Sequence, residues 1–161
     1  MNEDLPEQLR SHYQLENASC AVSGFESVAK LHGLIAPDAF PLQSDPTKQG
    51  MGFDDTSFLL SLCLLASDTH LARDIALDRI ESETSDGKFP LVSLLTGQAG
   101  STLYWHIFVC AQHGGDLLLI DPAYPKVQAQ QRAGLAAEFQ RTLDAIPDRQ
   151  MIHLLTYVKT K

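Results

Sequence analysis

The stretch QLENASCAVSGFESVAKLHG, residues 14–33, decides the fold and holds the first candidate for chemistry. Apolar residues recur in it at three- and four-residue spacing, which predicts a helix from the capping Ser19 to Gly33. Cys20 begins this helix, where the positive end of the helix dipole favours a thiolate over a thiol. Gly24, one turn later, leaves that face of the helix open for close packing.

Cys20 differs in its setting from the other two cysteines, Cys63 and Cys110, which lie inside apolar runs. We expect those two to be small buried hydrophobic residues. None of the three cysteines has the CxxC spacing of zinc or redox sites, and the six histidines are scattered, so we expect no metal and no cofactor. Without Gln14 and His106, Cys20 is better interpreted as a buried apolar residue of an ordinary helix.

A predicted β-hairpin supplies a partner for the thiol. The apolar run Trp105–Gln112 is typical of a central strand buried on both faces, and the turn His113–Asp116 leads into a return strand, Leu117–Ile120. If the turn is centred on its two glycines, His106 and Asp121 are diagonal neighbours on one face, about 7–8 Å apart at the backbone. Asp121 can then orient His106 as a general base. A three-residue loop would place Asp121 on the opposite face.

Gln14 is the third candidate partner, six residues before Cys20. Acyl transfer to a thiol places negative charge on a carbonyl oxygen, and a side-chain amide can stabilise that charge beside the backbone N–H of the cysteine. A glutamine just upstream can fold back over the helix start. Glutamine is a common surface residue, so this interpretation depends on Cys20 and His106.

The remaining pattern predicts an α+β fold with N-terminal helices packed on an antiparallel sheet, in a single domain over residues 1–161. Gly97–Ser101 is expected to be a loop. The other expected elements are helices over Ser57–Ala66, Thr69–Ile80 and Gln128–Ala145, and strands over Leu91–Leu95 and Met151–Val158.

Composition excludes several classes of partner. The formal net charge of −8 argues against binding to nucleic acid or to an anionic membrane surface. No apolar run approaches the roughly 18 residues of a membrane-spanning helix. The start, MNEDLPEQLR, is acidic where a signal peptide would be basic, so we expect a cytoplasmic protein, or one exported without a classical signal peptide. The oligomeric state is left open.

These residues resemble the papain-like cysteine peptidases, and in particular the bacterial double-glycine leader peptidases that process bacteriocin precursors. The resemblance extends from about Gln14 to Tyr124. In that family a glutamine precedes the catalytic cysteine by about this distance, the cysteine begins a helix, and the histidine is followed by a strand hairpin and Asp-Pro. The resemblance implies that Gln14 is the oxyanion donor, Cys20 the nucleophile, His106 the general base and acid, and Asp121 the orienting carboxylate.

The resemblance implies a peptidase that hydrolyses peptide bonds through a thioester on Cys20, with a peptide or protein as substrate. Two alternatives stay open. One is a thiol acyltransferase or amidase of the same fold, like phytochelatin synthases or transglutaminases. The other is a papain-like binding module that has lost turnover, because Ser19 and Ala21 stand where the family usually has aspartate and glycine.

Overall fold

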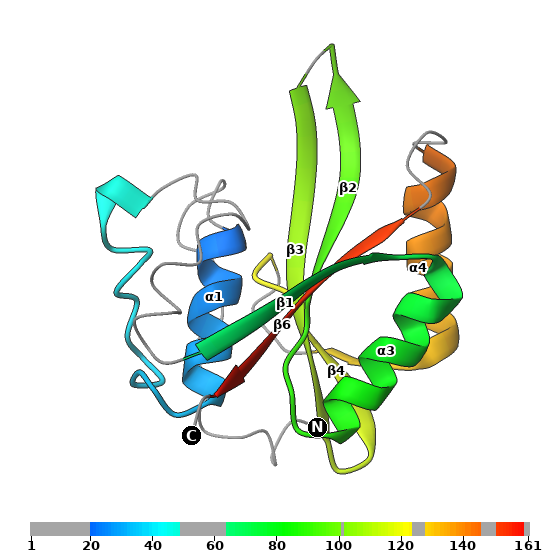
Figure 1. Ribbon diagram of the computed structural model, residues 1–161. Helices are drawn as coiled ribbons and strands as arrows, with labels where there is room; N and C mark the ends of the chain where they lie inside the picture. Colours follow the sequence, from blue (N-terminus) through cyan, green and yellow to red (C-terminus); the bar gives the residue numbers. More distant parts are fainter. Residues whose placement is uncertain (1–19, 49–63, 101, 124–127, 146–150, 160–161) are drawn as a thin grey trace.

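The computed structural model describes residues 20–48, 64–100, 102–123, 128–145 and 151–159 (Figure 1). The helices are α1 (Cys20–Leu31), the short 3-10 helix η2 (Pro46–Lys48), α3 (Arg73–Ser85) and α4 (Arg132–Ala145). The strands are β1 (Leu64–Leu71), β2 (Leu91–Ala99), β3 (Thr102–His113), β4 (Asp116–Ile120), β5 (Gln128–Gln130) and β6 (Ile152–Lys159).

The described strands form one six-stranded sheet in the order β1-β6-β2-β3-β4-β5. Neighbouring strands in this sheet run antiparallel. The predicted combination of helices with an antiparallel sheet is therefore confirmed. The helices do not all precede the sheet, however, because β1 comes before α3 in the chain.

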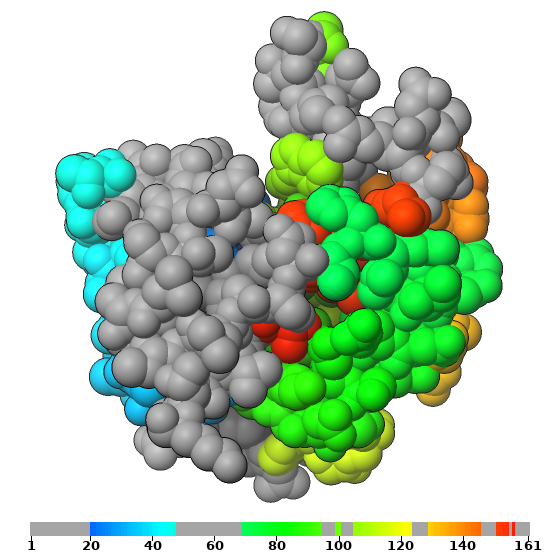
Figure 2. All heavy atoms as spheres, in the orientation of Figure 1, coloured from blue at the N-terminus to red at the C-terminus, as the bar shows by residue number. Residues whose placement is uncertain are grey.

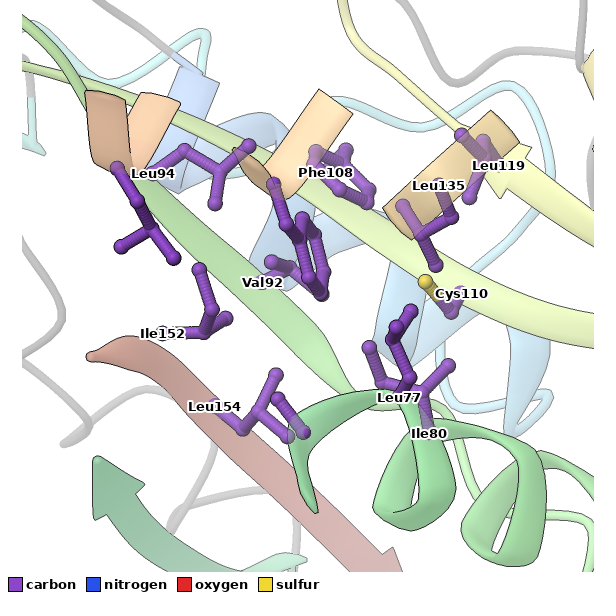
Figure 3. Packing of buried hydrophobic residues seen from close by; sticks show 13 residues of the cluster. Leu77, Ile80, Val92, Leu94, Phe108, Cys110, Leu119, Leu135, Ile152 and Leu154 are labelled. Carbon is purple, nitrogen blue, oxygen red and sulfur yellow. The ribbon is translucent and has the colours of Figure 1, made fainter. Parts of the chain in front are cut away.

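Alternate residues of β3 face two different hydrophobic clusters, which is why its sequence is apolar without interruption. Ile107 and Val109 pack with α1 residues such as Phe25 on one side of the sheet. Phe108 and Cys110 pack on the other side with residues of α3 and α4. Figure 3 shows this second cluster between strands and helices. The sheet is thus covered by α1 on one face and by α3 and α4 on the other (Figure 1).

Helix α1 ends where the sequence predicts. Gly33 adopts a φ of 69°, in the left-handed region that glycine enters without steric cost. Its N–H donates to the carbonyl of Lys30, and the N–H of Leu34 donates to that of Ala29. This pair of hydrogen bonds is the Schellman pattern, which satisfies carbonyl groups of the last helical turn.

The prediction for the segment before α3 is wrong in part. Of the helix expected over Ser57–Ala66, residues 57–63 lie outside the described residues, and Leu64–Ala66 belong to β1. The helix expected from Thr69 begins only at Arg73 and continues to Ser85. The cause is tertiary, since β1 pairs with β6 along its whole length. A short leucine-rich run does not by itself distinguish a buried helix from a strand.

Two further boundaries are corrected by strand pairing. Gln128–Gln130, expected as the start of a helix, form β5 against β4, and the helix begins at Arg132. Gly97–Ala99, expected in a loop, extend β2 beyond a bulge, so that β2 and β3 project together from the sheet (Figure 1). The expected last strand is present as β6. Among the described residues, no helix is long and apolar enough to cross a membrane.

Candidate active site

Cys20 is the first residue of α1 and is partly exposed. Its S–H donates to the main-chain carbonyl of Trp105, at 3.9 Å from sulfur to oxygen. Cys110, by contrast, is completely buried in the cluster under α3 and α4, and burial raises the pKa of its thiol. The expectation that Cys110 is a buried hydrophobic residue is confirmed, and Cys63 lies outside the described residues. Cys20 is the accessible cysteine of the part of the chain that the structure describes.

The β3–β4 hairpin has the register that the sequence predicts. His113 pairs with Asp116 across the turn, and the ladder continues to Val109 opposite Ile120. The two turn residues, Gly114 and Gly115, have φ values of 59° and 90°, as a two-residue hairpin turn of the primed type requires. This register places Asp121, the residue after Ile120, on the same face of the hairpin as His106.

His106 and Asp121 are in direct contact. The Nε2 of His106 donates to the Oδ2 of Asp121 at 2.7 Å. The second carboxylate oxygen, Oδ1, accepts the backbone N–H of Ala123 at 2.9 Å, so both oxygens of Asp121 have a partner that fixes the side chain. The predicted contact is confirmed by this distance. The orienting role of Asp121 remains a prediction.

The surroundings of His106 favour its charged form. The hydrogen bond to Asp121 is the main cause that raises the pKa of His106 to about 9, and a hydrogen bond with the Cys20 side chain adds to it. Burial acts in the opposite direction but is outweighed. Because Asp121 occupies Nε2, Nδ1 is the ring nitrogen available to Cys20. At neutral pH an imidazolium therefore lies beside the thiol, and a neighbouring cation stabilises a thiolate.

Strand β4 ends before it reaches the part of β3 that contacts the start of α1. The N–H of Cys110 donates to the carbonyl of Pro90, so the backbone groups of Cys110 point toward β2. The residues that alternate with it along β3 therefore point their N–H and C=O groups toward β4. These residues are Val109, Ile107 and Trp105. The next partner of Ile107 in the β3–β4 register is Pro122, which has no N–H to donate. The pairing of β3 with β4 ends at Val109 and Ile120, before Pro122. Beyond that point the start of α1 approaches β3, at Trp105.

The structure thus brings three of the four predicted residues together: Cys20, His106 and Asp121. Gln14 lies outside the described residues, and its role as an oxyanion donor remains a prediction. Sequence reasoning missed the carbonyl of Trp105 as a partner of the thiol. No side-chain pattern could have revealed it, because every residue has the same main-chain carbonyl and only the fold shows which one lies near Cys20. Among the described residues, no group of three or more His, Cys, Asp or Glu side chains is arranged to hold a metal ion.

Comparisons with known proteins add little to this geometry. Neither a protein-family model nor a curated protein matches the sequence. Among solved structures, the chain is similar to the avirulence protein AvrPphB of Pseudomonas, with a TM-score of 0.42 and 13% sequence identity. The alignment covers 84% of this chain and 72% of that protein. At this level the likeness supports no conclusion about activity.

Proposed function

We propose that this chain is a papain-like cysteine peptidase that hydrolyses peptide bonds through a thioester on Cys20. The observation that carries the proposal is the position of His106, which contacts Asp121 through Nε2 at 2.7 Å and lies near enough to Cys20 for that side chain to help raise the pKa of His106. A thiol at a helix start, an imidazole beside it and a carboxylate behind the imidazole are the components of an activated nucleophile. The described residues offer no comparable group around Cys110.

In the first half of the reaction, Cys20 attacks the carbonyl carbon of the scissile bond. In the reacting state the proton of Cys20 has left its hydrogen bond to the Trp105 carbonyl and is carried by Nδ1 of His106, and the C–S bond forms as the carbonyl oxygen becomes negatively charged. The backbone N–H of Cys20 and the side-chain amide of Gln14 donate to that oxygen. The C–N bond then breaks, and His106 gives its proton to the departing amine. The products are a free amino terminus and an acyl group held as a thioester.

In the second half, water replaces the amine. Neutral His106 takes a proton from the water, which attacks the thioester carbonyl, and the C–S bond breaks to regenerate the Cys20 thiolate and the imidazolium. Throughout both halves Asp121 holds the imidazole in one orientation and stabilises its positive charge. The acyl group leaves as a carboxylic acid, which loses its proton to the solvent, and the enzyme returns to its starting state.

The test is capture of the acyl-enzyme with a matched set of variants. Peptides containing a Gly-Gly sequence are the first substrates, because of the resemblance to double-glycine leader peptidases, followed by a mixed peptide library. We expect cleavage products with new amino termini and, after acid quenching, a mass increase on Cys20. Cys20→Ala abolishes both signals, while Cys110→Ala, which alters only a buried core thiol, retains them.

The product identifies the class of enzyme. Free carboxylate at the new terminus supports the peptidase. A product in which an added amine, and not water, has taken the acyl group would instead identify a thiol acyltransferase. A folded protein that binds the peptides but forms no acyl-enzyme and no product would contradict the proposal. The binding module would then be the remaining interpretation.

A further inference from the structure

Helix α1 approaches the sheet most closely at Gly24. A Cβ built on this glycine would lie 2.8 Å from Cδ2 of Leu91 on β2 and 3.3 Å from Cγ2 of Ile107 on β3. Side-chain carbons essentially never approach a Cβ to less than 3.0 Å. The Leu91 side chain is completely buried in the cluster that β2 and β3 form with α1, so it has little room to yield. The close packing at Gly24 that the sequence predicts is therefore confirmed.

The Gly24 contact lies next to the candidate active site on both α1 and β3. Gly24 follows Cys20 by four residues, which is one helical turn on the same face of α1. Ile107 directly follows His106 on β3, and the residue before His106 is Trp105, whose carbonyl accepts from the Cys20 thiol. The contact at Gly24 thus lies one helical turn from Cys20 and one residue from His106.

We propose that Gly24 is a positioning residue, whose missing side chain sets the distance between the Cys20 thiol and the His106 imidazole. The inference rests on the proposed acyl-transfer site and extends it to a residue that touches neither substrate nor reacting atoms. A methyl group at this position pushes the first turn of α1 away from β3 by several tenths of an ångström. Displacements of about 1 Å at a catalytic site lower rates by up to 10²-fold.

A purely structural role for Gly24 predicts a different result. In that case a larger side chain would lower the free energy of unfolding but leave the reactivity of Cys20 in the folded protein unchanged. A positioning role lowers the reactivity of Cys20 while the protein is fully folded. The decisive readouts are therefore the alkylation rate of Cys20 and the titration of His106, both measured well below the unfolding temperature.

The first experiment compares Gly24→Ala with the parent chain and with Val28→Ala. At pH 6 we expect Gly24→Ala to lower the rate of Cys20 alkylation by iodoacetamide about tenfold or more, because a thiol without its imidazolium partner is almost entirely protonated there. The NMR titration midpoint of His106 should fall below about 9, because the Cys20 contact contributes to the raised pKa. Val28, one turn further along and completely buried, is the matched control. Val28→Ala should lower stability yet keep the parent alkylation rate.

A second variant tests whether the contact with Leu91 is the cause. Leu91→Val removes the Cδ2 atom that a Cβ at position 24 would strike. Combined with Gly24→Ala, it should restore the alkylation rate to within about threefold of the parent, although each change alone lowers stability. Leu91→Val by itself should leave the rate near that of the parent.

Parent-like alkylation and an unchanged His106 titration in folded Gly24→Ala would overturn the inference, as would failure of Leu91→Val to restore the rate. These outcomes are separate from the fate of the proposed function. If the parent chain forms no acyl-enzyme, the proposed function fails, but the titration of His106 in the parent and in Gly24→Ala still decides whether Gly24 sets the spacing.

Discussion

At the scale of single residues, the carboxylate of Asp121 has the clearest expected effect. Its hydrogen bond is the largest cause that raises the pKa of His106 to about 9. Activity requires the imidazolium beside the thiolate, so it should decline as the pH rises through that pKa. We predict that Asp121→Asn shifts this basic limb of the pH–rate profile of kcat/KM to lower pH. It should also lower kcat/KM by roughly 10²–10⁴-fold, because general acid–base catalysis depends on an oriented imidazole.

The Asp121→Asn variant should fold like the parent, because asparagine has nearly the same shape and its oxygen can still accept the N–H of Ala123. If Asp121→Asn keeps nearly full activity and its basic limb lies at the same pH as in the parent, Asp121 only terminates a strand. The measurement is the pH–rate profile of peptide cleavage for both proteins between pH 5 and about 10.

At the scale of elements, Glu26 connects α1 to the loop that follows it. This carboxylate is buried and accepts the N–H of Leu42 at 2.6 Å, the N–H of Gln43 at 2.8 Å and the side-chain amide of Gln43 at 3.0 Å. Nearby, Lys30 is also buried, with its ammonium 4.2 Å from the centre of the Phe40 ring, and burial lowers the pKa of its side chain.

We predict that Glu26→Ala lowers the free energy of unfolding by about 2–4 kcal/mol, since it leaves two buried backbone N–H groups without their acceptor. Glu138→Ala is the matched control, because the Glu138–Arg141 pair is exposed and such pairs contribute about 1 kcal/mol or less. Urea unfolding of both variants provides the measurement. Equal losses in the two variants would show that the Glu26 contacts do not stabilise the folded chain.

The β3–β4 hairpin and strand β1 show which part of the fold the sequence alone could predict and which part it could not. The β3–β4 hairpin was predictable because two glycines in the turn fix its register locally. Strand β1 was not, because it exists through its pairing with β6, which is the last strand of the described sequence. Its leucines suit a helix as well as a strand, and only the distant partner decides between them.

The same distinction applies to the candidate site at the scale of the whole molecule. The contact between His106 and Asp121 spans 15 residues and follows from the hairpin register. The contact between Cys20 and β3 spans 85 residues, and no local rule predicts it. The resemblance to a family of peptidases supplied that pairing. The carbonyl of Trp105, which carries no side-chain signature, became evident only in the structure.

The stability of the whole molecule should depend on the protonation of His106. Its pKa is raised above the ordinary value of 6.5 to about 9 in the folded chain, so folding favours the protonated form. This contribution is fully present below about pH 6.5 and is lost as the pH rises through about 9. We predict that His106→Gln destabilises the chain more at pH 6 than at pH 10. A loss of stability independent of pH would contradict the linkage.

The most direct test of the central claim, that His106 activates the Cys20 thiol, is the rate of Cys20 alkylation as a function of pH. We predict rapid labelling of Cys20 alone at pH 6, located by mass spectrometry, because the His106 imidazolium favours the thiolate. In His106→Ala, labelling at pH 6 should fall at least tenfold and rise only near pH 8.5, the ordinary range of a free thiol. Identical pH profiles in the two proteins, or faster labelling of Cys63 or Cys110 than of Cys20, would contradict the account.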